Sequence, residues 1–408
     1  MATGVNCRSC GHAGLEPVLD LGRTPLADRL VSAAQLAEQE PAYPLQVAFC
    51  SQCSLLQIIE TVPPEVLFCE DYPYYSSFSD ALLRHSRDNV LDLIRRRGLG
   101  SQSLAVELAS NDGYLLKNYV EAGIPVLGID PAEGPAREAE KIGVRTLNTF
   151  FTVELAKRLA AEGMQADVIH GNNVLAHVAD TNGFVGGIAT LLKDGGVAVI
   201  EVPYVKDLID HREFDTIYHE HLCYFSVTAL DHLFRRHGLY LNEVKRLSIH
   251  GGSLRLYVEK VERVGPSMQE LLALEAAERV DRIDFYHDFA RRVEHLKAEL
   301  LVLLRGLKAD GRTIAAYGAA AKGATLINYV GIGRDLVDFV VDRNIHKQGK
   351  YMPGQHLPIF GPEKLLEAQP DFVLLLAWNF ATEIIEQQAE YARRGGRFIV
   401  PVPVPRVV

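Results

Sequence analysis

The sequence lacks a long apolar run, a targeting pattern and an excess of positive charge. No stretch approaches the roughly 20 apolar residues that span a bilayer, so we expect no membrane partner. The opening MATGVNCRSC has no basic region followed by an apolar one, which makes a cytoplasmic location the expectation. The net charge of −10 argues against a nucleic-acid partner, although a few local lysines and arginines could still hold one acidic ligand.

The length and the cysteine number bound the architecture. A chain of 408 residues exceeds one ordinary core, so we expect two or three domains, with a monomer as the simplest assembly. Six cysteines in a reducing compartment favour metal binding or free thiols over disulfides. Cys69 and Cys223 stand apart from the others, and we expect both to be free thiols.

The other four cysteines form two C-x-x-C pairs. Cys7 pairs with Cys10, and Cys50 pairs with Cys53 in FCSQCSLLQ. Four thiolates are the usual ligands of tetrahedral structural zinc, whereas a redox dithiol needs only one pair. The spacing therefore predicts a structural zinc site without a catalytic role. The long gap between the pairs predicts an inserted loop or strand pair.

A tyrosine-rich stretch, EDYPYYSSFSD, follows at residues 70–80. A proline beside three tyrosines is typical of a loop. A packed turn between domains is the favoured interpretation. The alternative is a lid that brings Tyr72, Tyr74 or Tyr75 over a ligand.

The middle of the chain begins with a helical pattern at residues 81–97 and continues as strand, turn and helix. The turn ELASNDG is not a G-x-G-x-x-G fingerprint and lines up better with the acid-x-G-x-G-x-G loop of AdoMet methyltransferases. Glu107 holds the acid position and Gly113 the last glycine, while Ala109 and Asn111 replace the first two. Asp130 ends the next strand, where an acid can accept hydrogen bonds from ribose hydroxyls.

Strands and helices keep alternating through residue 205, as in a doubly wound sheet. The fourth strand ends in a polar turn that contains Asn172 and Asn173, which we assign to the cofactor site. His177 follows on the ligand-facing side, where it either contacts ligand or is a satisfied structural group.

The segment FDTIYHEHLCYFS, residues 214–226 and hereafter the YHEH segment, admits three interpretations. A catalytic metal could use His219 and His221, but H-E-x-x-H spacing and a third ligand are missing. A hydrogen-bonded piece of core is the second. The third is proton transfer, with His221 as base, Glu220 orienting it and Tyr218 donating to an oxyanion. The spacing does not choose among them.

The C-terminal part repeats the α/β theme. Residues 267–308 predict a long amphipathic helical connector. The following pattern predicts a second, smaller Rossmann-like domain with a small-residue turn containing Gly318, Lys322 and Gly323. This turn would suit a phosphate, or it is simply a tight turn with a solvated lysine. Arg255 lies near another polar turn, in SIHGGSLRLYVE.

Taken together, the motifs resemble the zinc-containing, AdoMet-dependent sugar C-methyltransferases, typified by the C-3′-methyltransferases of antibiotic deoxysugar pathways. The resemblance covers essentially the whole chain, and its motifs in order are the two C-x-x-C pairs, DYPYYSS, ELASNDG, NNVLAHV, YHEHLCYFS, HGGSLR and YGAAAKG. The tripartite order together with YHEH is the specific part.

The resemblance implies an α/β chain with a zinc-binding domain at 1–80, an AdoMet domain at 81–265, a helical connector at 266–308 and a Rossmann-like nucleotide-sugar domain at 309–408. It implies a dTDP-linked 4-keto-deoxysugar substrate. The active-site residues that it implies are Tyr72, His177, Tyr218, Glu220 and His221. The substrate-binding residues assigned with it are Tyr75, His250, Gly252, Ser253, Arg255, Tyr317, Lys322 and Asn328.

The implied chemistry suits these residue types. A ketone acidifies the neighbouring C–H, so that an imidazole at His221 can remove the proton while Tyr218 or His177 stabilises the enolate oxygen. Lys322 and Arg255 would meet the pyrophosphate. The alternatives are C-5 methylation or another keto substrate, a non-catalytic AdoMet-binding or zinc scaffold, and a nicotinamide-dependent sugar oxidoreductase, against which the A-A-A-K-G spacing counts.

Overall fold

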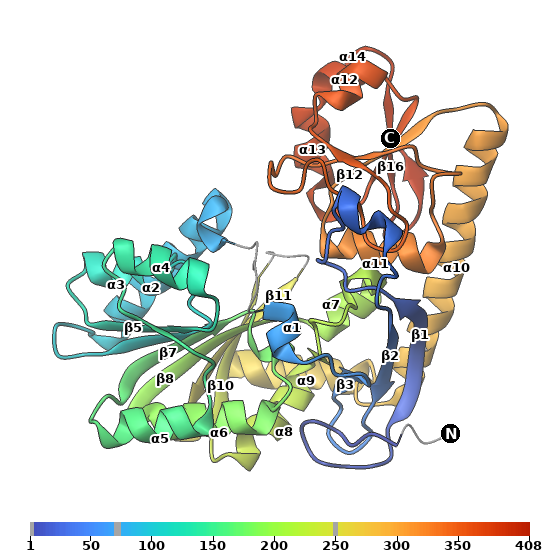
Figure 1. Ribbon diagram of the computed structural model, residues 1–408. Helices are drawn as coiled ribbons and strands as arrows, with labels where there is room; N and C mark the ends of the chain where they lie inside the picture. Colours follow the sequence, from blue (N-terminus) through green and yellow to red (C-terminus); the bar gives the residue numbers. More distant parts are fainter. Residues whose placement is uncertain (1–3, 69–74, 248–251) are drawn as a thin grey trace.

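Three sheets organise the chain in the computed structural model, which describes residues 4–68, 75–247 and 252–408. Figure 1 shows the N-terminal sheet and the C-terminal domain on one side of the larger central domain. Tyr72, Cys69 and His250 lie outside the described residues. Among the described residues, no helix is both long and apolar enough to cross a membrane.

The N-terminal sheet has the order β1-β2-β3-β9 and is antiparallel throughout. Its strands are β1 (Glu16–Thr24), β2 (Tyr43–Phe49), β3 (Leu56–Ile58) and β9 (Cys223–Tyr224). The hairpin of β1 and β2 is the insertion predicted between the two cysteine pairs, and η1 (Ala33–Ala37) lies in its loop. The fourth strand belongs to the YHEH segment, so that this segment is bound to the N-terminal sheet by a strand pairing.

The central domain is the predicted doubly wound sheet, with the order β10-β11-β8-β7-β4-β5-β6. Its strands are β4 (Ala105–Leu108), β5 (Val126–Asp130), β6 (Thr146–Asn148), β7 (Ala166–Asn172), β8 (Leu192–Pro203), β10 (Tyr240–Leu247) and β11 (Ser253–Glu259). The pairings from β6 to β8 are parallel, and β11 and β10 add antiparallel strands at the edge. The parallel strands are apolar and buried because helices cover both faces.

Figure 1 places α5, α6 and α8 along one face of this sheet and α2, α3 and α4 along the other. The helices of the central domain are α2 (Asp80–Arg97), α3 (Lys117–Glu121), α4 (Glu133–Lys141), α5 (Val153–Ala161), α6 (Thr181–Leu191), α7 (Val205–Asp210) and α8 (Val227–Arg236). Short α1 (Pro64–Phe68) and η2 (Ser76–Phe78) flank the undescribed residues 69–74. The helix predicted at 81–97 is confirmed as α2, and it ends at Gly98 in a left-handed conformation.

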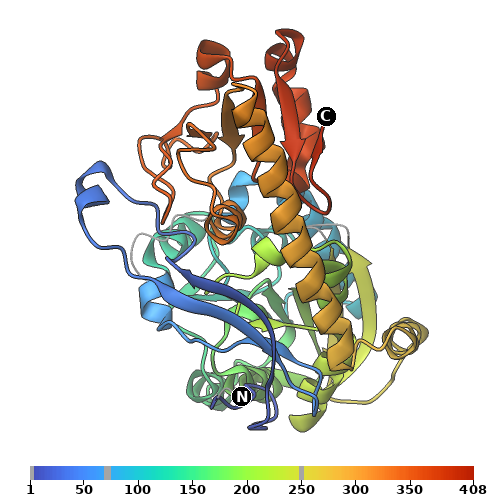
Figure 2. The same ribbon diagram turned by 90° about the vertical axis from the view of Figure 1, so that its right-hand side faces the viewer.

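The predicted helical connector consists of two helices, α9 (Pro266–Ala277) and α10 (Ile283–Ala309). The chain breaks where Arg279 takes a positive φ of 61°, which an α-helix does not allow. Figures 1 and 2 show α10 running from the central domain up to the C-terminal domain. Its buried residues recur at helical spacing and face the core that it shares with β1: Tyr286, Phe289, Val293, Leu296, Leu300 and Leu304.

The C-terminal domain is the second, smaller sheet that the sequence predicts, with the order β14-β13-β12-β15-β16-β17. Its strands are β12 (Ile314–Tyr317), β13 (Val340–Val341), β14 (Ile359–Phe360), β15 (Phe372–Leu375), β16 (Arg397–Val400) and β17 (Arg406–Val407), of which β17 alone is antiparallel. Its helices are α11 (Ala321–Val330), α12 (Lys364–Ala368), α13 (Ala381–Gln387) and α14 (Ala389–Arg393). α11 starts directly after the central strand β12, as in a Rossmann-like unit. The exact domain limits given above stay predictions.

Candidate active site and metal centre

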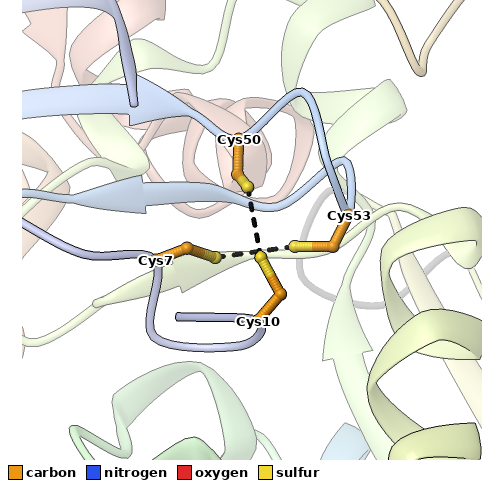
Figure 3. Close-up of side chains that lie close together, drawn as sticks. All are labelled: Cys7, Cys10, Cys50 and Cys53. Atoms are coloured by element: carbon orange, nitrogen blue, oxygen red, sulfur yellow. Dashed lines mark hydrogen bonds between the residues drawn. The ribbon is translucent and has the colours of Figure 1, made fainter. Parts of the chain in front are cut away.

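The four paired cysteines converge on one point (Figure 3). The sulfur atoms of Cys7 and Cys53 are 3.5 Å apart, as are those of Cys10 and Cys50, and all four lie within 4.8 Å of one another. Four thiolates about 2.3 Å from one zinc ion lie about 3.8 Å from each other, so this arrangement fits tetrahedral zinc. No fifth ligand group joins the cluster among the described residues, which suits a closed structural site.

The first cysteine pair is also attached to its surroundings. The Arg8 amide N–H donates to Oε1 of Gln57, on strand β3, at 2.8 Å. Asn182 on α6 donates its side-chain N–H groups to the carbonyl oxygens of Arg8 and Ser9, at 2.7 and 3.0 Å. The zinc site therefore fixes a loop that links the N-terminal sheet to the central domain.

The loop after β4 has the backbone shape of a ligand loop. Ala109, Asn111 and Gly113 all have positive φ, of 55°, 49° and 76°. These are the positions aligned above with the three glycines of generic AdoMet loops. Glycine is favoured there because left-handed φ costs a side-chain-bearing residue roughly 1–2 kcal/mol, and asparagine tolerates it better than alanine. The loop thus keeps the conformation although two of the glycines are replaced.

Asp130 closes this loop from the end of β5. Its two carboxylate oxygens accept the backbone N–H groups of Asn111 and Ala132, both at 2.8 Å. Burial raises the pKa of Asp130, and the two N–H groups oppose this shift because they stabilise the carboxylate. The predicted ribose contact of Asp130 stays a prediction.

Two buried polar side chains at the carboxyl ends of β4 and β7 fit a polar ligand. Glu107 is 1% exposed, and among the described residues neither carboxylate oxygen has a hydrogen-bond partner of good geometry, although the Tyr114 side chain lies close enough to stabilise the carboxylate. Burial first, and then the charges of Asp130 and Asp112, raise the pKa of Glu107 well above its usual range. The side-chain amide of Asn172 is likewise buried, and it has no hydrogen-bond partner within the described part of the chain. Native structures rarely leave such groups unpaired, so these residues suit the polar groups of AdoMet.

The tyrosine-rich stretch, as far as it is described, packs on the AdoMet loop. Ser76 donates its N–H to Asn111 Oδ1 at 2.9 Å, and Ser77 donates to Asp112 Oδ2 at 3.1 Å. Tyr75 lies against Gly134, where a Cβ would approach the phenol oxygen to 2.8 Å. Residues 75–77 therefore lie over this loop, which the favoured interpretation as a turn between domains did not predict.

In the YHEH segment, hydrogen bonds define which ring nitrogen of His221 carries the proton. His221 Nδ1 lies 2.8 Å from the carbonyl oxygen of Thr216, and a carbonyl only accepts, so Nδ1 carries the proton. His221 Nε2 lies 2.9 Å from the Tyr218 hydroxyl and accepts from it. A neutral imidazole whose Nε2 carries no proton is the form that can act as a base.

His177 stands edge-on to His221, with ring centroids 4.8 Å apart. It ends η3 (Leu175–His177), just after β7. Burial lowers the pKa of His177 to about 4, opposed by a backbone hydrogen bond at Glu220, so His177 is neutral at pH 7. Burial and the charge of Asp28 raise the pKa of Glu220 well above its usual range. Tyr218, His221 and His177 thus lie close together, and the Glu220 backbone adjoins His177; their catalytic roles stay predictions.

His219 points elsewhere. Its Nε2 donates to the carbonyl oxygen of Pro44 at 3.1 Å, on strand β2. Within residues 4–68, 75–247 and 252–408, no second group of three metal-ligating side chains converges. The described residues therefore give the catalytic-metal interpretation of the YHEH segment no support.

Several predicted substrate residues have structural partners. Arg255 Nε donates to Glu201 at 2.6 Å in a buried ion pair on the central sheet, with His85 against the same carboxylate. Ser253 is buried on that sheet, and a Cβ at Gly252 would lie 2.4 Å from Asp207.

In the C-terminal domain, Asn328 donates to the carbonyl oxygens of Ala324 and Pro353, at 2.8 and 3.0 Å. Tyr317 is buried at the end of β12. Lys322 faces the Glu213 carboxylate at 3.9 Å and the Trp378 ring at 5.1 Å. In this structure, the Lys322 ammonium group therefore lies beside Glu213 and Trp378, while its predicted contact with pyrophosphate stays a prediction.

Sequence reasoning missed the groups that other domains add around the YHEH segment. Besides burial, the charge of Asp28, from the N-terminal part, raises the pKa of Glu220. Burial raises the pKa of Asp28 in turn, and the charge of Lys347, from the C-terminal domain, opposes this shift. Trp378 of the C-terminal domain donates its indole N–H to Asp215 at 2.6 Å. No local signal could reveal these pairs, because the partners are distant in sequence.

Comparisons with known proteins identify the relatives of the chain. The family model for the C-methyltransferase C-terminal domain matches residues 248–403, a zinc binding domain model matches 7–68, and a methyltransferase domain model matches 82–244. The chain is 38% identical to C-methyltransferase NovU of Streptomyces niveus over 405 residues, which cover 98% of this chain and 96% of that protein.

More remote similarities are confined to part of the chain. Over 96 residues it is 28% identical to the ubiquinone biosynthesis O-methyltransferase of Bartonella quintana, covering 23% of this chain and 39% of that protein. Magnesium protoporphyrin IX methyltransferase of Synechocystis PCC 6803, solved with bound SAM, is 15% identical over 45% of this chain and 82% of its own, with a TM-score of 0.34. That score is too low to add to the argument.

The full-length similarity, the cysteine cluster and the ligand loop agree with one another. The scaffold and oxidoreductase alternatives have no comparable support. The chain belongs to the zinc-binding, AdoMet-dependent C-methyltransferases.

Proposed function

We propose that this enzyme methylates C-3′ of a dTDP-linked 4-keto-deoxysugar, in a deoxysugar pathway of the kind that serves antibiotic synthesis. The observation that carries the proposal is the His221 imidazole, held with Nδ1 protonated and with Nε2 beside the Tyr218 hydroxyl. A base next to a hydrogen-bond donor is what enolate formation requires.

His221 Nε2 takes the proton from the carbon beside the ketone. The Tyr218 hydroxyl, which donates to Nε2 in the free enzyme, turns its hydrogen bond to the ketone oxygen as negative charge develops there. One such donor is worth roughly 3 kcal/mol at an oxyanion. The imidazolium that results keeps its Nδ1–H bond to Thr216 and later releases the proton from Nε2 to water.

AdoMet, when bound, supplies a methyl group on a positively charged sulfur, the electrophile that the enolate carbon needs. Glu107, Asp130 and Asn172 are the residues that would hold its polar groups. His177 stays neutral beside His221, because burial lowers its pKa to about 4. It therefore adds no positive charge that would oppose protonation of the base.

The direct test is a panel of dTDP-4-keto-sugars incubated with AdoMet. We expect one product to gain a single methyl group by mass, and NMR should place that group on C-3′. If NMR places the methyl group on C-5, the assignment to C-3′ is wrong, but the reaction is still C-methylation. Methylation only on oxygen or nitrogen would overturn the proposal.

A second test isolates the base. In D2O without AdoMet, the enzyme should exchange the C-3′ proton of its substrate for deuterium, because enolate formation is reversible. His221→Asn should abolish this exchange. Exchange at the wild-type rate in that variant would remove His221 from the base role.

A further inference from the structure

The C-terminal domain contacts the turn at the start of the YHEH segment, just before His221. The turn is η4 (Phe214–Thr216), and it packs under α11 of the C-terminal domain. Trp378, on η6 (Trp378–Phe380), donates its indole N–H to Asp215 Oδ2 at 2.6 Å. Asp215 is fully buried, so this bond forms away from water.

The next residue of the same turn fixes the imidazole. Thr216 presents the carbonyl oxygen that accepts the Nδ1–H of His221 at 2.8 Å. The turn is closed by backbone bonds from Thr216 N–H to Glu213 and from Ile217 N–H to Phe214. A shift of Asp215 therefore moves the Thr216 carbonyl as well, because the two residues are consecutive in one hydrogen-bonded turn.

We propose that Trp378 and Asp215 are positioning residues, through which the C-terminal domain holds the Thr216 carbonyl in place and so keeps His221 in the tautomer whose Nε2 is free of a proton. The chain of contacts runs from indole N–H to carboxylate, through the turn from Asp215 to Thr216, and from carbonyl to imidazole N–H. If the carbonyl moves away, the proton is no longer held on Nδ1, and the form with the proton on Nε2 cannot accept another there.

The charged surroundings of Asp215 agree with a constrained position. Lys322, at the start of α11, lies between the Glu213 carboxylate and the Trp378 ring. Lys322 belongs to the C-terminal domain, whereas Glu213 and Asp215 belong to the central domain. The three charged groups meet where η4 packs against α11. The lysine assigned to pyrophosphate from the sequence thus contributes to this junction.

The inference rests on the proposed role of His221, and the test separates the two. The variants are Trp378→Phe and Asp215→Leu, which remove the indole–carboxylate bond, and Asp215→Asn, which keeps an oxygen acceptor. Phe380→Leu is the matched control, because Phe380 ends the same short helix and is 51% exposed.

We expect Trp378→Phe and Asp215→Leu to lower kcat by about tenfold or more, since small displacements of a catalytic group can cost about a hundredfold. The KM for AdoMet should stay within about twofold, because the AdoMet loop is untouched. Asp215→Asn should retain most of the activity, and Phe380→Leu should match the wild type.

A readout independent of turnover is the His221 tautomer, from the nitrogen shifts of histidine-labelled enzyme, with the His221→Asn spectrum for assignment. The wild-type protein should show His221 protonated on Nδ1, and Trp378→Phe should show a mixture of the Nδ1-protonated and Nε2-protonated tautomers. Trp378 is the single tryptophan of the chain, so its fluorescence also reports how far the surroundings of the indole change when Asp215→Leu removes the carboxylate.

The outcomes divide cleanly. Wild-type kcat and an unchanged tautomer in Trp378→Phe would overturn the positioning role while leaving His221 as the base. Full turnover in His221→Asn would overturn the base and this inference together. If Asp215→Leu fails to fold, Trp378→Phe still decides, because the Trp378 side chain is only partly buried.

Discussion

At the scale of single residues, the protein accepts backbone strain where its ligand loop needs a particular shape. Ala109 has the left-handed conformation without the freedom of glycine or the side-chain hydrogen bonds of asparagine. Such residues persist only when their surroundings hold them, and they cluster at functional sites. The loop conformation is thus enforced by neighbours such as Asp130, which binds the N–H of Asn111.

This strain can be measured. Ala109→Gly should raise the free energy of unfolding by up to about 1 kcal/mol, because glycine adopts positive φ without the steric cost. Ala105→Gly, on the extended strand β4, is the matched control and should lower it by about 1 kcal/mol. Urea unfolding of the two variants checks the prediction, and a loss of stability in Ala109→Gly would contradict it.

His221→Asn should leave AdoMet affinity nearly unchanged and lower turnover by about 100-fold or more, because general-base catalysis is lost. Tyr218→Phe, which keeps the ring and removes only the hydroxyl, should cost about 100-fold through the lost hydrogen bond to the enolate. Calorimetric titration with AdoMet and steady-state kinetics give both numbers. A large loss of AdoMet affinity in His221→Asn would point to a binding role.

Asp215 should make stability depend on pH. Burial raises its pKa from 3.8 to about 6, against the opposing effects of Lys322 and Trp378. The folded state therefore binds the proton more tightly than the unfolded state, and this contribution falls as pH rises from about 4 to about 6. Above pH 6, Asp215→Asn should be more stable than the wild type by about 3 kcal/mol, and near pH 4 the advantage should vanish. Melting temperatures across this range test the sign.

At the scale of elements, β9 explains why the zinc site and the YHEH segment belong together. It is only two residues long, and it pairs with β3, which follows the second cysteine pair almost directly. Leu222 accepts a further bond from the N–H of Ile58. A structural metal can therefore influence the YHEH segment without touching substrate, because it lies beside β3, the strand with which β9 pairs.

Cys50→Ser should remove the zinc, lower the melting temperature and reduce kcat more than AdoMet affinity. The structural reason is that the loop carrying Cys50 leads into β3, and β3 supports β9. Metal analysis, thermal unfolding and kinetics on the same preparation provide the check. Cys223→Ser, at a buried thiol outside the cluster, is the control and should retain full zinc content. Full zinc occupancy in Cys50→Ser would contradict the four-cysteine site.

At the scale of the whole molecule, α10 contributes to an apolar cluster that contains residues of all three parts. Its buried face packs with β1, with α7 and with β12 in a single apolar cluster.

Leu300→Ala should lower the free energy of unfolding by about 2–5 kcal/mol, because it leaves a cavity in this shared cluster. Val302→Ala, at a position 74% exposed on the same helix, should change stability little. Calorimetry should show the single transition of the wild type move down as a unit, and two separated transitions would show that α10 does not couple the parts.

The sequence was sufficient for features that depend on local pattern. Apolar periodicity predicted the helix at 81–97 and the alternating strands, and two C-x-x-C pairs predicted the zinc ligands. The break in the connector at Arg279 was not predicted, because nothing in its neighbours requires a positive φ there.

Contacts between distant parts of the chain could not be predicted. Trp378 and Asp215 are 163 positions apart, and their hydrogen bond exists only because two folded domains meet. Arg255 was expected at phosphate because its sequence neighbours are polar, whereas its burial beside Glu201 follows from strand pairing with β8. Side-chain partners of this kind depend on tertiary packing, which a single sequence does not display.

The pairing of β3 with β9 also sets an order for biosynthesis. The cysteine ligands leave the ribosome within the first 53 residues, but the sheet beside them stays one strand short until position 224 has been made. Most of the central domain is translated in that interval, so the open edge of β3 is exposed while a second domain is forming. A nascent chain stalled before Tyr224 should therefore retain metal yet be more sensitive to protease around β3 than one released beyond it.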